Sequence, residues 1–324
     1  KVTSKIARDS SAVFVELGID TRRNKATKSG EVRDIWVDDR TGESVPHGLR
    51  IDTEMRAKYQ RGRQSVHQYL RMTSIVNPHA SISLVVRDRD GSTIEQGDWP
   101  RTTEKLPRIV SEIRPHPHGI QLGSLQRMLK ESQERKMTSF LRHNFSGVSM
   151  RAAREILSAS GLDESRSPKR ISADEAQAMV LAFHKVKLLS PPTDCLSPIE
   201  DLLIKKGLSK AIDSRFASTI TRNPKVTNGN PFQIEVGLVF GGDLSADGPI
   251  EILRFANRVP LMYQQGGCLL TKALESVDWK RYGLDHPGGK GIPKGPAAVL
   301  IHLASTNVQF TSEAKEAVSD NEEV

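Results

Sequence analysis

The sequence predicts an α+β protein with more than one domain. Strand-length apolar runs occur near both ends of the chain, at residues 13–19 and 297–304, whereas residues 122–207 have the spacing of helices. With 324 residues the chain is long enough for two or three domains. In residues 236–306 two strand-like runs, a helix-length segment and another strand follow one another. This order predicts a β-β-α-β unit with a right-handed crossover.

The composition indicates a soluble globular protein with a basic net charge. Hydrophobic residues make up 37% and charged residues 27% of the chain, as in soluble globular proteins. No apolar run is long enough to span a bilayer, so we do not expect the protein to have a membrane as a partner. The net charge of +8 favours a polyanionic partner. Cys195 and Cys268 lie far apart without metal-ligand spacing, which predicts buried free thiols in a reducing cytoplasm.

The first part of the chain predicts strands around one helix. Residues 2–6 and 13–19 have strand patterns, and a strand at 49–55 follows a polar loop at 21–46 that we expect to be mobile. Apolar residues at helical spacing place a helix at 64–75. A strand at 81–86 then leads into a hairpin signal, Asp90-Gly91. The opening residues are no signal peptide and begin in a strand without Met, so we expect a fragment that begins inside a domain.

A basic turn lies between the third strand and the helix. It contains Lys58, Arg61 and Arg63 around a glycine. Such a turn can present several cations to neighbouring phosphates. The alternative is a solvated basic turn with no ligand.

The middle of the chain predicts a helical module. Residues 112–119 are rich in proline and histidine and mark a boundary, and the alternating His116 and His118 are not expected to bind metal. Ser149 and Gly161 are start and stop signals of one helix. Capping boxes at 172–175 and 197–200 open two more helices, with Gly207 as the expected stop of the second.

Two candidate sites lie near the C-terminal end. The loop before the last strand contains four glycines and Lys294, and glycine-rich backbone with lysine can bind an anion. The alternative is a flexible loop with solvated lysines. The cluster Trp279-Lys280-Arg281-Tyr282 places aromatic rings beside cations, which suits nucleic acid. Its alternative is that Trp279 and Tyr282 are core residues.

Several long motifs resemble the transducer domain of the DNA topoisomerase VI B subunit. They are Leu238-Val-Phe-Gly-Gly-Asp-Leu, Phe255-Ala-Asn-Arg-Val-Pro-Leu, Tyr263-Gln-Gln-Gly-Gly, Trp279-Lys-Arg-Tyr-Gly and Ile292-Pro-Lys-Gly-Pro. The resemblance implies that Lys294 reaches the γ-phosphate of ATP bound on a neighbouring domain. It also implies DNA contacts by the loop with Lys58, Arg61 and Arg63, and by Trp279, Lys280 and Tyr282.

Residues 1–6 and 69–80 are similar to the second half of the ATP-binding domain of the same family, of the GHKL class (gyrase, Hsp90, histidine kinase, MutL). The family's Mg²⁺-binding Asn, adenine-binding Asp and glycine-rich lid lie upstream of residue 1. The resemblance therefore implies ATP and Mg²⁺ as cofactors of the parent protein, with no catalytic residue and no metal site in this stretch. Helices flanking Gly161 and Pro168 resemble the family's helix-two-turns-helix module.

The resemblance implies three domains. They are the end of a GHKL α/β sandwich at 1–108, the helix-two-turns-helix domain at 109–195, and the transducer at 196–324, where residues 311–317 begin a stalk helix. The implied function is ATP-dependent relaxation of supercoils by double-strand passage, in a cytoplasmic, nucleoid-associated and archaeal enzyme.

The implied partners are the topoisomerase VI A subunit, which carries the catalytic tyrosine, double-stranded DNA, and a second B subunit with which it dimerises on binding ATP. Alternatives are a non-enzymatic DNA-binding module and a MutL-like mismatch-repair ATPase.

Overall fold

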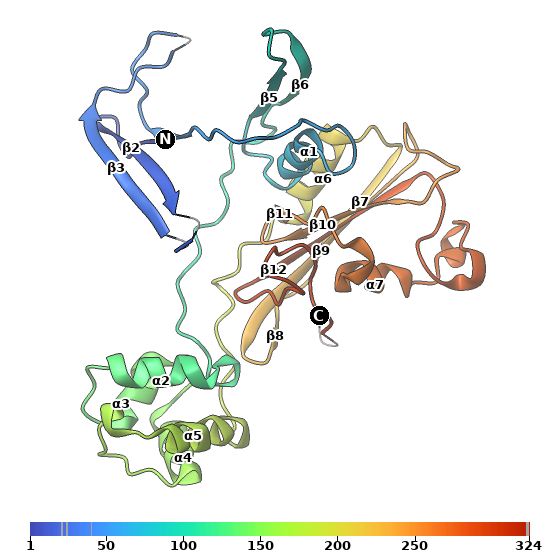
Figure 1. Ribbon diagram of the computed structural model, residues 1–324. Helices are drawn as coiled ribbons and strands as arrows, with labels where there is room; N and C mark the ends of the chain where they lie inside the picture. The colour runs from blue at the N-terminus through green and yellow to red at the C-terminus, as the bar shows by residue number, and fades with distance from the viewer. Residues whose placement is uncertain (21, 24, 40, 322–323) are drawn as a thin grey trace. The chain divides into compact units, whose positions relative to one another are not determined.

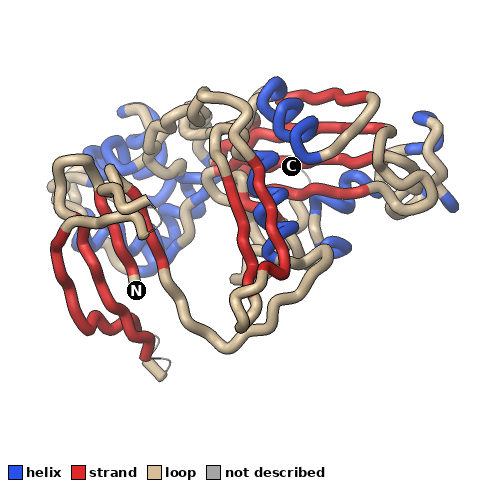
Figure 2. The backbone as a smooth tube through the Cα atoms, turned by 90° about the horizontal axis from the view of Figure 1, so that it is seen from above, coloured by secondary structure: helices blue, strands red, loops and turns tan. Residues whose placement is uncertain are grey.

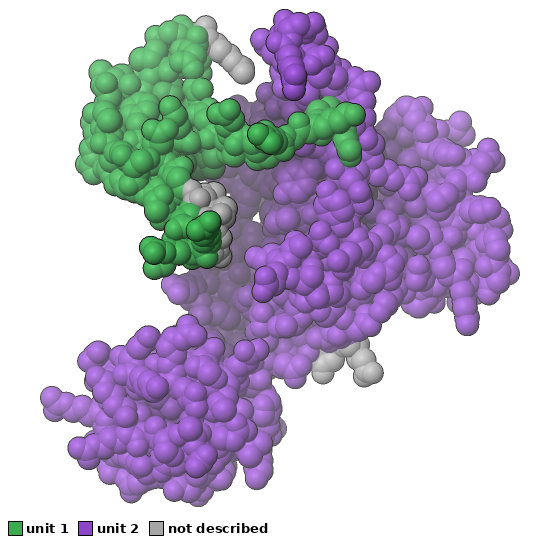
Figure 3. All heavy atoms as spheres, in the orientation of Figure 1, with its two compact units in different colours: residues 1–60 green, residues 61–324 purple. Residues whose placement is uncertain are grey.

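The computed structural model describes residues 1–20, 22–23, 25–39, 41–321 and 324 (Figure 1). The chain forms two compact units, Lys1–Gln60 and Arg61–Val324, which Figure 3 colours separately. Among the described residues, every helix belongs to the second unit.

The first unit is a four-stranded antiparallel sheet in the order β3-β2-β1-β4. Its strands are β1 (Val2–Lys5), β2 (Ala12–Asp20), β3 (Lys25–Asp34) and β4 (Gly48–Ile51). The first two strands confirm the prediction. The predicted strand at 49–55 is too long, since β4 ends at Ile51.

Strand β3 corrects the prediction of a loop at residues 21–46. It pairs with β2 from Ala12 opposite Asp34 to Asp20 opposite Lys25, with one irregularity after Glu16. Every residue of β3 is exposed. A strand with no buried face has no reason to alternate apolar and polar residues, so its sequence carries no period-two signal. Backbone pairing with β2 forms it instead.

The second unit is built on a six-stranded sheet in the order β11-β10-β12-β9-β7, with β8 paired to β9. Figure 2 shows the strands of the chain in red. The strands are β7 (Phe216–Thr221), β8 (Lys225–Thr227), β9 (Asn230–Phe240), β10 (Glu251–Ala256), β11 (Val259–Pro260) and β12 (Ala297–Ser305). Strands β10 and β12 are parallel, and α7 (Leu269–Glu275) lies between them in sequence. This confirms the predicted β-β-α-β order, while the hand of the crossover stays a prediction.

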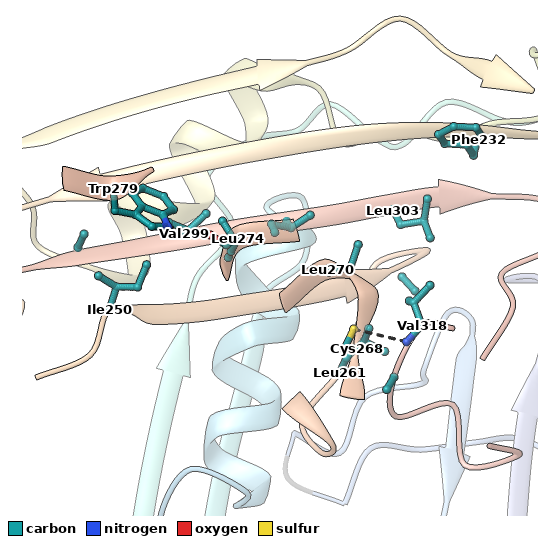
Figure 4. Close-up of a cluster of buried hydrophobic side chains, with 14 of the residues drawn as sticks. Phe232, Ile250, Leu261, Cys268, Leu270, Leu274, Trp279, Val299, Leu303 and Val318 are labelled. Carbon is teal, nitrogen blue, oxygen red and sulfur yellow. Dashed lines mark hydrogen bonds between the residues drawn. The ribbon is translucent and has the colours of Figure 1, made fainter. Parts of the chain in front are cut away.

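Both faces of the six-stranded sheet are covered, which explains why β12 is buried throughout and mostly apolar. On one face Ala298 and Leu300 pack with α1 (Val66–Val76) and α6 (Asp201–Ala211). On the other face Val299 and Leu303 pack with residues of α7 and with Trp279 (Figure 4).

Helices α1 and α6 contact each other closely. Helix α1 confirms the predicted helix, and the Ser65 hydroxyl accepts from the Gln68 N–H at its start. The capping box predicted at 197–200 is wrong, because α6 begins at Asp201 and has no side-chain cap of its own. Gly207 is not a stop. It lies inside α6 against α1, where a Cβ atom would lie 1.9 Å from the Ile75 carbonyl oxygen.

The helical module has its own core and contains the predicted caps. Its helices are α2 (Leu122–Glu131), α3 (Met137–Asn144), α4 (Met150–Ser160) and α5 (Ala173–Lys185), with the short 3-10 turns η1 (Pro117–Gly119) and η2 (Pro168–Arg170). Ser149 caps α4, and Gly161 ends it in the left-handed conformation. Ser172 and Glu175 form the predicted capping box of α5.

Two further segments complete the second unit. The predicted hairpin forms from β5 (Ile82–Arg87) and β6 (Thr93–Trp99). The helix predicted at 311–317 is wrong. Residues 310 and 318 form a bridge, the Thr311 N–H donates to the Ala317 carbonyl, and Lys315 has a positive φ of 56°. Ala317 and Val318 are buried in the core cluster beside α7, and the Val318 carbonyl accepts from the Leu269 N–H at 2.9 Å, which holds this turn in place.

Candidate functional site

The loop that carries Lys294 is fixed on both sides of this residue. The Lys294 N–H donates to the Asp285 carbonyl at 2.7 Å, and the Gly295 N–H donates to the Gly248 carbonyl at 3.0 Å. The Ile250 N–H donates to the Pro293 carbonyl at 3.0 Å. The backbone at Lys294 is thus held against the start of β10, and Lys294 stands at the entry to β12.

A buried histidine spans the same loop. The His286 ring is fully buried, and its Nε2 lies 2.9 Å from the Gly291 carbonyl, to which it donates. Gly295 has a φ of +149°, and a Cβ there would lie 2.4 Å from a methyl group of the buried Leu284. The loop is therefore ordered by specific contacts and is not the flexible loop of the alternative. A lone histidine gives no spacing signal, so sequence reasoning missed His286.

The Lys294 side chain is exposed, and no carboxylate lies within 4.0 Å of its ammonium group in the described part of the chain. An unpaired ammonium on a fixed backbone can bind a phosphate oxygen as a point charge. The same loop also carries Lys290, which is exposed as well. The two lysines differ in backbone pairing, because only Lys294 takes part in the bridges to residues 249 and 285.

The aromatic-basic cluster forms the 3-10 turn η4 (Trp279–Tyr282), in which the two rings have different environments. Trp279 is only 8% exposed, and its indole N–H donates to the Leu274 carbonyl at 2.7 Å (Figure 4). The core alternative therefore holds for Trp279. Tyr282 is 72% exposed, with its ring centroid 6.4 Å from that of Trp279, and Lys280 is exposed beside it. Trp279 thus supports the turn that presents Tyr282 and Lys280.

The three cations of the basic turn are all exposed. Lys58 belongs to the first unit, and Arg61 and Arg63 belong to the second. The Arg61 guanidinium donates to the Ile94 carbonyl of the β5–β6 hairpin. No ion pair involves Lys58, Arg61 or Arg63 among the described residues. Their charges are available to an external anion.

Comparison with known proteins identifies the family. A family model described as the transducer of the topoisomerase VI B subunit matches residues 191–324. The B subunit of the type 2 DNA topoisomerase 6 of Methanococcoides burtonii is 47% identical over 324 residues, 100% of this chain and 50% of the relative. The chain belongs to the topoisomerase VI B-subunit family. This confirms the resemblance drawn from the motifs.

Other archaeal relatives with the same name agree. The Methanosarcina barkeri protein is 48% identical over 322 residues, which cover 99% of this chain and 50% of the relative. The Archaeoglobus fulgidus protein is 41% identical over 319 residues, or 98% of this chain and 51% of the relative. The chain spans about half the length of these relatives.

The matched B-subunit transducer region contains a buried polar network that sequence reasoning missed. The Glu235 carboxylate on β9 is fully buried and accepts four hydrogen bonds. They come from the Ile199 N–H at 2.7 Å, the Glu200 N–H at 2.8 Å, the Thr221 hydroxyl at 2.7 Å and the His302 ring at 2.7 Å. Glu235 thus takes the place of a local cap where the chain enters α6. No local sequence pattern predicts a cap that comes from a distant strand.

His302 on β12 links this carboxylate to the turn between β10 and β11. Its Nδ1–H donates to Glu235, and its Nε2 accepts from the Arg258 N–H at 3.0 Å. An acceptor at Nε2 requires neutral imidazole, and burial lowers the pKa of His302 accordingly, against the opposing effect of Glu235. Although burial alone would raise it, hydrogen bonds from His302 and its other donors leave the pKa of Glu235 below its ordinary value.

Arg258 extends the network to the helices. Its guanidinium donates to the Val76 carbonyl at the end of α1 at 2.7 Å, and to the Pro198 carbonyl before α6 at 2.9 Å. Asn257 and Arg258 both have positive φ, 47° and 65°, as a two-residue turn between antiparallel strands requires. Residues 255–261, Phe-Ala-Asn-Arg-Val-Pro-Leu, thereby form a structural joint between α1, α6 and the sheet.

Metal ligands are not grouped in the described part of the chain, where no three of His, Cys, Asp and Glu converge. His116 Nε2 lies 3.0 Å from the Leu189 carbonyl, and His118 Nε2 lies 3.0 Å from the Phe183 carbonyl. Both rings therefore serve the structure of the helical module. Cys268 is buried and free, whereas Cys195 is free but only partly buried, which corrects the expectation for that thiol. No helix among the described residues is long and apolar enough to cross a bilayer.

Proposed function

We propose that the chain is part of the B subunit of an ATP-dependent type II DNA topoisomerase, which relaxes supercoils by passing one duplex through another. The observation that carries this proposal is Lys294. Its ammonium group is exposed and unpaired on a backbone that is fixed on both sides, in the region that matches the family's transducer. Such a group can report the presence of an anion to the sheet that it adjoins.

In this proposal Lys294 binds the γ-phosphate of ATP. The described residues offer a phosphate ligand but no carboxylate cluster for Mg²⁺, so ATP and Mg²⁺ would be held chiefly by residues outside this chain. Lys294 gains its partner only in the nucleotide-bound arrangement, and the bond therefore shifts the population toward that arrangement. The buried His286 ring orders the loop, and β12 leads from the end of the loop into the core.

DNA would be bound by the phosphate backbone and not by base sequence. Lys58, Arg61, Arg63, Lys280 and Tyr282 are exposed and can reach a polyanion, and Trp279 supports Tyr282 from the core. The net charge of +8 favours such binding.

This contact can be tested by its salt dependence. Each phosphate contact contributes about 0.9 to the slope of log affinity against log salt. Changing Arg61 and Arg63 together to Ala should lower the slope by about 2. An unchanged slope in a filter-binding titration would show that the turn does not touch DNA.

The proposed domains are the end of a GHKL ATP-binding domain at 1–108, a helix-two-turns-helix domain at 109–195 and the transducer at 196–324. These limits differ from the compact units, since α1 packs with α6. The proposed partners are double-stranded DNA, a second B subunit on ATP binding, and the A subunit that carries the catalytic tyrosine. We place the complex in the cytoplasm with the nucleoid.

The role of Lys294 is tested in the protein expressed from its complete gene, mixed with its A subunit. Lys294→Ala should abolish ATP-driven relaxation of supercoiled plasmid and leave DNA binding nearly intact. Lys290→Ala is the matched control, because it removes the same charge from the same loop. Loss of relaxation and DNA binding together, or the same loss in Lys290→Ala, would rule out γ-phosphate recognition by Lys294.

A further inference from the structure

A polar groove runs along the outer edge of strand β10, opposite β12. Its volume is about 710 Å³, within the range of ligand sites in proteins. Residues 249–254 form its floor, and α1, the loop after β11 and the Lys294 loop contribute walls through Gln68, Gln264 and Gly295. All of these residues belong to the second unit.

The outer edge of β10 has one gap in its backbone pairing, at Ile252. Strand β11 pairs only with Phe255 and Ala256. Farther along the same edge, the Arg254 carbonyl accepts from the Leu261 N–H, and the Ile250 N–H donates to Pro293. Backbone groups of alternate residues point to the same edge, so Ile252 between them also faces outward. No strand or turn of the described residues pairs with the Ile252 N–H and carbonyl on that side.

Arg254 adds an uncompensated charge to the groove. It is only 2% exposed, and its Nη2 donates to the Leu261 and Tyr263 carbonyls, both at 2.9 Å. Its Nη1 is buried without a partner, and no carboxylate lies within 4.0 Å of the guanidinium in the described residues. A buried charge that meets only neutral carbonyls is stabilised strongly by an anion.

The other charges of the lining favour an acidic ligand. Glu251 is neutralised by Arg71 at 3.1 Å. Arg63 is exposed and has no ion pair among the described residues, and Asp243 is exposed, where solvent screens its charge. Two arginines therefore remain against one screened carboxylate.

We propose that this groove binds an extended acidic peptide segment of a partner protein, which forms a β-bridge with Ile252 and places a carboxylate beside Arg254. The Ile252 N–H and carbonyl would form the two backbone hydrogen bonds of this bridge, and successive side chains of the peptide would point to opposite walls. A free donor and a free acceptor on one edge residue match a peptide backbone, which carries both groups. A nucleic-acid backbone offers phosphate oxygens as acceptors but no backbone donor for the Ile252 carbonyl.

The test uses fluorescence anisotropy of a labelled eight-residue peptide that alternates Glu and Val, added to the 324-residue chain. We expect saturable binding, and binding about tenfold weaker for a peptide N-methylated at alternate residues, because its ladder donors are blocked. A peptide that alternates Lys and Val should bind at least about tenfold more weakly than the Glu peptide.

Three variants probe the groove directly. Ile252→Pro removes only the outward N–H, because the bonds to β12 come from the neighbouring residues, and edge strands tolerate proline. Ile252→Pro and Arg254→Gln should each weaken binding of the Glu peptide about tenfold. Arg63→Gln, on an exposed side chain that does not endanger folding, should weaken it severalfold. Arg151→Gln on α4 removes the same charge outside the groove and should leave the affinity unchanged.

Several outcomes would overturn the proposal. They are no binding of the Glu peptide, equal binding of the N-methylated or Lys peptide, and an effect of Arg151→Gln equal to that of Arg63→Gln. The assay is repeated with the protein expressed from its complete gene. Loss of binding there would mean that another segment of the same polypeptide fills the groove, which excludes a partner peptide.

Discussion

Replacing Gly207 by Ala should separate helices α1 and α6. A Cβ at this position would lie 1.9 Å from the Ile75 carbonyl oxygen, whereas such contacts are essentially never below 3.0 Å. The obstacle is backbone and cannot rotate away, so the helices must move apart by roughly 1 Å, the difference of these distances. Overpacking of this kind costs about 1–3 kcal/mol, and we expect the upper end here because backbone must shift. The higher helix propensity of Ala offsets about 1 kcal/mol, which leaves a net loss of about 2 kcal/mol.

The measurement is urea unfolding of the 324-residue chain, followed by tryptophan fluorescence, because Trp279 lies in the core of the same unit. Gly123→Ala on α2 is the matched control, since its Cβ would have nothing within 4 Å. That variant should be neutral or gain up to about 1 kcal/mol. If Gly207→Ala is as stable as Gly123→Ala, the close contact between the helices does not exist and the packing argument fails.

Two further predictions concern the buried network. Glu235→Gln leaves one acceptor oxygen for four donors and should lower the free energy of unfolding by about 3–5 kcal/mol. Glu155→Gln, at an exposed position, is the control and should change the free energy of unfolding little. Equal urea midpoints for the two variants would contradict the role of Glu235 at the start of α6. Burial lowers the pKa of His302 below the value of about 6.5 that it has when unfolded, so the unfolded state binds the proton first and stability falls as pH drops below about 6.5. His302→Asn should flatten the unfolding free energy between about pH 7 and pH 5, and the lowered pKa values of His79 and His116 supply the remaining slope. An unflattened profile would mean that His302 is not neutral in the folded protein.

Features with local causes were predictable from the sequence. Ser149, Gly161 and the pair Ser172–Glu175 act on backbone groups within four residues, so their signals lie beside the helices that they bound. The apolar run at residues 297–304 predicted a strand, and β12 forms there. The motifs around Lys294 also identified the family before any contact was known.

Other features depend on partners far along the chain. The start of α6 is capped by Glu235, 36 residues from the Ile199 N–H that it accepts, and a local capping box was predicted in its place. Strand β3 forms by backbone pairing, which polar side chains do not reveal. The sequence placed Trp279 and Tyr282 in one cluster, but only packing against α7 decided that Trp279 is buried and Tyr282 exposed.

The sequence by itself determined the family, the order of strands and helices at the C-terminal end, and the lysine that stands before β12. The tertiary structure decided how that lysine is held, because the Asp285, Gly248 and Ile250 groups that fix its loop come from segments without sequence periodicity. It also decided which charges remain unpaired. Local patterns report hydrogen bonds and packing within about one helical turn, whereas the sites depend on neighbours that only the folded chain brings together.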